Sequence, residues 1–117
     1  MSRIKLPDRR LNQTLAVDVH LDNKTHRILL TVGFDVVVIA GTHGPVKHHY
    51  PREVFCADFK AGTSLHAFVT DACILYSRLL QHGDDPAELR ESMCTPPSLI
   101  GQIAKAVEGP WTWEDGV

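Results

Sequence analysis

Apolar and polar residues alternate over two stretches near the N-terminus. The first covers residues 15–21, LAVDVHL, and the second covers residues 28–32, ILLTV, with the turn-like sequence DNKT at residues 22–25 between them. A period of two places successive side chains on opposite faces of a β-strand. The pattern therefore predicts a β-hairpin with one buried face.

The next apolar stretch does not alternate. After Gly33, residues 34–40 read FDVVVIA, an almost unbroken run of β-branched residues. Such runs are typical of strands that are buried on both faces or lie at a subunit contact, so we expect a third strand here. Residues 41–52, GTHGPVKHHYPR, have the Gly and Pro content of an exposed loop, and residues 53–59 predict a further short strand.

Residues 65–81 predict a long amphipathic helix, because their apolar side chains recur at three- and four-residue spacing. Thr63 or Ser64 can cap its first turn, and Gly83 stands where a left-handed residue ends a helix. The stripe expected to face the core is Leu65, Phe68, Val69, Ala72, Cys73, Leu75, Tyr76, Leu79 and Leu80. On this interpretation, replacing Leu75 or Leu79 with Ala costs roughly 2 to 5 kcal/mol.

Two shorter helices follow. Asp85, Pro86 and Glu88 supply an N-cap, a proline for the first helical position and a capping-box carboxylate, which predicts a helix through about Met93. Ser98 can cap a last helix, which ends before the Gly-Pro pair at residues 109–110.

The order of these elements predicts an α+β fold, since the strands precede the helices along the chain. We expect an antiparallel sheet packed against one long amphipathic helix, with the two shorter C-terminal helices at its ends. A length of 117 residues with 44% hydrophobic content fits one domain, placed at residues 14–109. A basic N-terminal arm at residues 1–13 and an acidic, Trp-containing tail at residues 110–117 flank it.

The charge argues against a protein that binds nucleic acid in bulk. The net charge is -2, the pI is about 6.4, and the basic cluster is confined to Arg3, Lys5, Arg9 and Arg10. The sequence contains neither an apolar run of about 18 residues nor the apolar core of a signal peptide, so we expect a soluble, cytoplasmic protein. The three cysteines have no CxxC spacing and are interpreted as reduced thiols.

Histidines and a cysteine are the candidates for chemistry. His43, His48 and His49 cluster in the expected loop and are weak candidates for binding zinc, nickel or copper, but adjacent His48 and His49 would point apart in an extended segment. Cys73 lies on the apolar stripe, away from His66 and Asp71, which favours an inert buried thiol over a nucleophile. We therefore assign no catalytic residue and expect no cofactor or metal.

Several short motifs in a fixed order resemble the TSCPD domain, which forms a region near the C-terminus of adenosylcobalamin-dependent ribonucleotide reductases and also occurs in stand-alone proteins. The motifs are ILLTVG at residues 28–33, PREVF at 51–55, KAGTSL at 60–65, LLQHG at 79–83 and PAEL at 86–89, within a match over residues 6–107. The TSCPD signature itself is missing, and CTPP at residues 94–97 is only weakly similar to it. The resemblance implies the α+β fold and a loose link to deoxynucleotide synthesis. It carries over no catalytic residue, because the radical cysteine and cobalamin pocket of such reductases lie outside this domain.

Two functions from different classes follow. The first, which we favour, is a non-catalytic accessory or regulatory module that binds a protein partner or a second copy of itself. The second is a small metal- or ligand-dependent enzyme that uses the three histidines. For the first, we expect docking through residues 34–40 together with the tail, because a domain of this size can cover only one face of that strand. The expected partner-binding residues are Val36, Val37, Val38, Ile39, Trp111 and Trp113.

Overall fold

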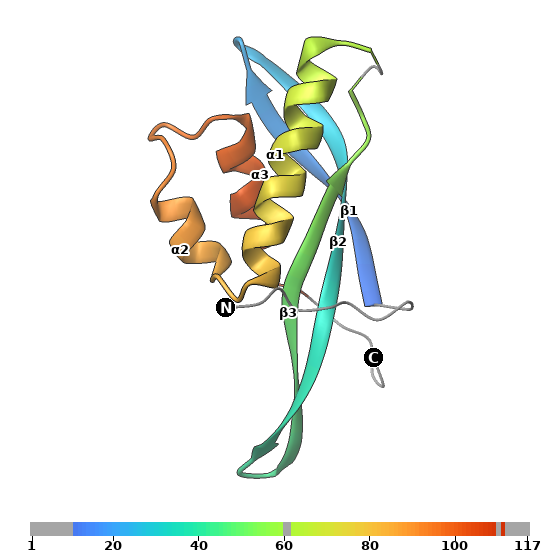
Figure 1. Cartoon of the computed structure of the whole chain (residues 1–117), viewed down its shortest axis with the longest axis vertical. Coiled ribbons are helices and arrows are strands. Elements are labelled where there is room, and N and C mark those ends of the chain that lie inside the picture. The colour runs from blue at the N-terminus through green and yellow to red at the C-terminus, as the bar shows by residue number, and fades with distance from the viewer. Residues whose placement is uncertain (1–10, 60–61, 110, 112–117) are drawn as a thin grey trace.

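The computed structural model describes residues 11–59, 62–109 and 111. Strands β1 (Leu11–Leu21), β2 (Lys24–Gly41) and β3 (Gly44–Cys56) form an antiparallel sheet in the order β1-β2-β3. Helices α1 (Ser64–Gln81), α2 (Pro86–Glu91) and α3 (Leu99–Val107) follow the strands and lie against one face of the sheet (Figure 1). The predicted α+β fold is confirmed.

The first predicted hairpin is also confirmed. Asp22 and Asn23 form its turn with φ values of 51° and 64°. Two consecutive residues with positive φ give the type I′ turn whose twist suits a two-residue β-hairpin. The paired strands begin at Leu11, so the end of the expected N-terminal arm belongs to β1.

The prediction of a separate third strand at residues 34–40 is wrong. These residues continue β2 without a break, and the expected loop that follows them is most of β3. Gly33 pairs with Glu53 and Phe34 pairs with Pro51, so Arg52 is an extra residue that forms a bulge. The prolines in β3 pointed to a loop, but an edge strand accommodates proline because its outward amides need no partner strand.

The core lies between the helices and the covered face of the sheet. α1 packs over β3 and α3 packs over β1. The largest fully buried side chains are Phe34, Ile28, Leu30, Leu80, Ile103, Val19, Val32, Val69 and Val107. They come from β1, β2, α1 and α3, so the core joins elements from both halves of the chain.

The predicted core stripe of α1 is only partly correct. Val69, Cys73, Tyr76 and Leu80 are buried, whereas Phe68, Leu75 and Leu79 are 61%, 64% and 44% exposed. Each of those three exposed residues directly precedes a buried residue of the helix, namely Val69, Tyr76 and Leu80. Successive residues of an α-helix are rotated by about 100°, so the exposed residues form a second line beside the buried one. A single helix on a three-stranded sheet buries one line of side chains, and no described element covers the second line. The predicted cost of roughly 2 to 5 kcal/mol for Leu75→Ala or Leu79→Ala assumed buried side chains, and the structure shows that this assumption is wrong.

The helix ends agree with the sequence. Thr63, Asp85 and Ser98 accept hydrogen bonds from the amides of His66, Ala87 and Gly101, at 3.1, 3.0 and 3.1 Å. Gly83 and Gly109 have φ values of 98° and 88°, which only glycine adopts easily. α2 ends at Glu91, slightly earlier than expected. Among the described residues, no helix is both long and apolar enough to cross a membrane.

Candidate functional site

The paired ends of β2 and β3 form a hairpin that projects beyond the helices (Figure 1). We call residues 35–50 the distal hairpin. Its pairs run from Asp35 with Tyr50 to Gly41 with Gly44, and a two-residue turn of Thr42 and His43 closes it. Gly44 has a φ of 114°, a value that favours glycine at this turn. The sequence run that predicted a doubly buried strand thus forms one side of a projecting ribbon.

The distal hairpin exposes apolar side chains on both of its faces. Val38 is 59% exposed and lies on the face that continues from the core residue Phe34. Val37, Ile39 and Val46 are 38%, 42% and 46% exposed and lie on the opposite face. No described part of the chain covers either set, so this segment is a concentrated exposed apolar surface.

The histidines do not form a metal site in the part of the chain that the structure describes. His43 lies in the turn, whereas His48 and His49 are consecutive residues of β3, opposite Val37 and Val36. Consecutive side chains of a strand point to opposite faces, as expected from the sequence. His48 stacks on Tyr50, with ring centroids 6.1 Å apart and an interplanar angle of 17°. No three His, Cys, Asp or Glu side chains among the described residues converge on a metal position.

Arg52 anchors the base of the distal hairpin to the end of α1. Its Nη1 donates to the carbonyl of Leu80 at 2.7 Å, and its own carbonyl accepts from Nε2 of Gln81 at 3.1 Å. The guanidinium also lies 5.3 Å from the ring centroid of Tyr50, within cation–π range. The bulge that places Arg52 here therefore fixes the direction in which the hairpin leaves the domain.

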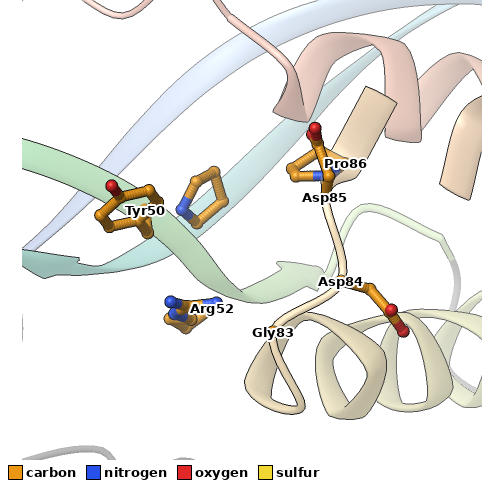
Figure 2. Close-up of a pocket in the computed structure, with 7 residues that line it drawn as sticks. Tyr50, Arg52, Gly83, Asp84, Asp85 and Pro86 are labelled. Carbon is orange, nitrogen blue, oxygen red and sulfur yellow. The ribbon is translucent and has the colours of Figure 1, made fainter. Parts of the chain in front are cut away.

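A pocket of about 280 Å³ lies at this base (Figure 2). Tyr50, Pro51 and Arg52 of β3 line one side, and residues 83–86 of the connection between α1 and α2 line the other. Its walls combine an aromatic ring, a guanidinium and two prolines, whereas Figure 2 shows the Asp84 side chain directed away from Tyr50 and Arg52. This lining suits a peptide segment with both apolar and charged groups better than a purely apolar ligand.

Trp111 belongs to the domain as well as to the tail. Its ring packs edge-on against Phe34 at a centroid distance of 4.9 Å and an interplanar angle of 80°, and its Nε1 donates to the carbonyl of Val107 at 3.0 Å. These contacts leave Trp111 half-buried and packed next to the start of the hairpin. Trp113, like Arg3, Lys5, Arg9 and Arg10, lies outside the described residues.

The two buried thiols, Cys56 and Cys73, have the properties of structural cysteines. Cys56 and Cys73 are buried and Cys94 is exposed. Burial, with a smaller contribution from Cys56, raises the pKa of Cys73 from 9.0 to about 11, and burial also raises the pKa of Cys56. A thiol with a raised pKa is a poor nucleophile at neutral pH. Neither buried thiol therefore has the chemistry of an active-site cysteine.

The sequence did not identify Val46, Tyr50 or Arg52 as part of the site, because all three lay in the expected loop or its end. Comparison of the chain with protein-family models, curated proteins and solved structures found no match in any of the three. The site is therefore interpreted from its own geometry, and the resemblance to the TSCPD domain stays a prediction.

Proposed function

We propose that this protein is a non-catalytic accessory or regulatory module that binds a partner protein through its distal hairpin. The observation that carries the proposal is the exposure of Val37, Val38, Ile39 and Val46 on a ribbon that the helices do not cover. Exposed apolar surface is costly to keep on a protein that binds nothing.

The chemistry of the distal hairpin favours a protein surface over a polyanion. Asp35 and Lys47 are its charged residues and have opposite signs. Specific recognition of nucleic acid draws much of its affinity from clustered Lys and Arg, which this ribbon lacks. An apolar ribbon with alternating faces instead suits insertion into a groove between two surfaces of a partner.

The size of the apolar contribution indicates that the partner also contacts the base. Four Val and Ile side chains that pass from about half exposed to buried contribute roughly 3 to 6 kcal/mol in total. Association costs about 4 kcal/mol or more in lost translational and rotational freedom, so the tip alone gives weak binding. Tyr50 and Arg52 at the adjoining pocket are the groups placed to supply the remainder.

The resemblance to the TSCPD domain supports one class of partner to test first. In the family, this domain accompanies the catalytic part of adenosylcobalamin-dependent ribonucleotide reductases, so a reductase subunit from the same cell is the first candidate. The competing enzyme hypothesis finds no supporting arrangement of His43, His48 and His49 within the described residues.

Site-specific photo-cross-linking in cells tests the proposal. A photoreactive amino acid at Val38, near the tip, should give one discrete adduct with another protein. The same amino acid at Asn23, in the turn at the other end of β2, is the matched control and should give none. Adducts that are equal at the two positions, or absent at Val38, would contradict docking through the distal hairpin.

A further inference from the structure

Side chains of α1 occupy the outer edge of β3 at Arg52 and Val54, near the base of the distal hairpin. The amide of Val54 donates to Oγ of Ser77 at 2.9 Å, and the Ser77 hydroxyl donates onward to the carbonyl of Cys73 at 2.7 Å. Two residues back along the strand, the carbonyl of Arg52 accepts from Gln81. These bonds satisfy backbone groups that would otherwise offer a template for another strand.

The outer edge of β1 is occupied at one end only. The side-chain amide of Gln102 binds both backbone groups of His20: its Oε1 accepts from the His20 amide at 2.7 Å, and its Nε2 donates to the His20 carbonyl at 2.8 Å. Backbone groups alternate in direction along a strand, so the residues that face outward with His20 are Asn12, Thr14, Ala16 and Asp18. All four are exposed, and no described residue occupies their outward backbone groups.

We propose that this open edge pairs antiparallel with the same edge of a second copy, around a two-fold axis at Leu15. In this register Asn12 pairs with Asp18 of the second copy and Thr14 pairs with its Ala16, and each such pair exchanges two hydrogen bonds. In this register all four residues with open backbone groups form pairs, and His20 is not among the paired residues. A shift by two residues places Asn12 opposite His20, whose backbone groups Gln102 already holds.

The side chains of β1 suit this pairing. Leu15 and Val17 point toward the core but are only half-buried, whereas Val19 beside the Gln102 contact is fully buried. At the axis Leu15 meets Leu15 of the second copy, and both become covered. On the opposite face, the carboxylate of Asp18 lies across from Asn12, so no like charges are brought together.

A hollow beside the edge provides room for the second copy. Its volume is about 630 Å³, and it lies between Val17, Asp18 and His20 of β1 and Gln102, Lys105 and Ala106 of α3. In the proposed register Gln13 of the second copy lies opposite Val17, next to this hollow. None of the described residues fills this hollow, so α3 leaves room for a second β1 along the open edge.

Oxidative cross-linking of the purified full chain tests the register. Exposed Cys94 is first replaced by Ser, since it can itself form disulfides. Leu15→Cys should then form a covalent dimer, because directly opposite residues at a non-hydrogen-bonded position are about 4.5 Å apart at Cα, which a disulfide spans. Gln13→Cys and Val17→Cys should cross-link only when the two are mixed. Failure of Leu15→Cys to cross-link, or a strong dimer of Val17→Cys alone, overturns the proposal.

Analytical ultracentrifugation of Ala16→Pro gives the second test. The Ala16 amide points outward and pairs with nothing in the described chain, so proline removes a bond of the dimer and none of the domain. We expect dimerisation to weaken by on the order of tenfold or more, with an unchanged circular dichroism spectrum. Ala16→Val, which keeps the amide, should remain a dimer. A wild-type monomer at tens of micromolar, or a dimer lost in Val37→Lys/Ile39→Lys but retained in Ala16→Pro, overturns the proposal.

Discussion

Replacing Leu80 with Ala should strongly destabilise the domain, whereas the same change at its neighbour Leu79 should not. Leu80 is 0% exposed and Leu79 is 44% exposed, although both belong to the apolar stripe of α1 in the sequence. Removing the three outer carbons of a buried leucine costs about 2.4 kcal/mol in transfer free energy, at about 0.8 kcal/mol per carbon. The space left behind raises the expected loss for Leu80 to about 3 to 4 kcal/mol.

The exposed positions supply matched controls. Leu75 is 64% exposed, so Leu75→Ala and Leu79→Ala should each change the free energy of unfolding by less than about 1 kcal/mol. Urea denaturation followed by circular dichroism, at one protein concentration, measures all three variants. With a slope of about 1.5 kcal/mol/M, Leu80→Ala should lower the midpoint by about 2 to 2.7 M. Equal losses at Leu79 and Leu80 would refute the assignment of which helix face is buried.

Three further predictions concern buried polar groups and thiols. Ser77→Ala leaves the buried amide of Val54 without its acceptor and should cost about 1 to 3 kcal/mol in the same urea assay; a loss within error would mean that water replaces the hydroxyl. Because the pKa of Cys73 is raised from 9.0 to about 11 in the folded state, the unfolded chain loses its proton first. The stability should therefore fall between about pH 9 and pH 11, by on the order of 3 kcal/mol at most, and Cys73→Ala should reduce that slope. A thiol reagent at pH 8 should label Cys94 rapidly and should reach Cys56 and Cys73 only on unfolding, so rapid labelling of three thiols would contradict their burial.

The elements specified by local chemistry were predictable from the sequence. The caps Thr63, Asp85 and Ser98, and the turn at residues 22–25, depend on side chains that bond to backbone only a few residues away. Such signals involve residues only a few positions apart along the chain, and the structure confirms each of these caps and the turn. The α+β class followed because the strands were correctly expected to precede the helices, even though several element boundaries were wrong.

The elements specified by tertiary contacts were not predictable in the same way. FDVVVIA has the composition of a buried strand, but only its first residue, Phe34, is buried, and composition alone does not show what covers a strand. Residues 44–50 were predicted to be part of a loop because of the Gly and Pro content of the segment, yet an extended partner at residues 35–41 holds them in β3. The stripe of α1 was assigned too broadly because two adjacent lines of a helix can both be apolar while only one meets a sheet.

The candidate site was predicted in part. Residues 36–39 were expected to lie on an uncovered surface; Val37, Val38 and Ile39 are exposed in the structure, whereas Val36 is half-buried. Tyr50 and Arg52 were missed because their role depends on the bulge opposite Gly33, which brings them to the end of α1. The polar caps Ser77, Gln81 and Gln102 were also missed, although a polar residue next to a buried apolar line is a signal for such contacts.

The central claim is that the distal hairpin binds a partner protein, and a binding titration with the protein captured from Val38 tests it most directly. The wild-type chain is compared with Val37→Lys/Ile39→Lys and with Leu75→Lys/Leu79→Lys, which places the same charges on the exposed line of α1. The account predicts a loss of affinity of about a hundredfold or more for the hairpin variant, because two charges enter an apolar contact. It predicts a change of less than about threefold for the helix variant. Unchanged affinity of the hairpin variant, with its fold intact, would contradict the claim.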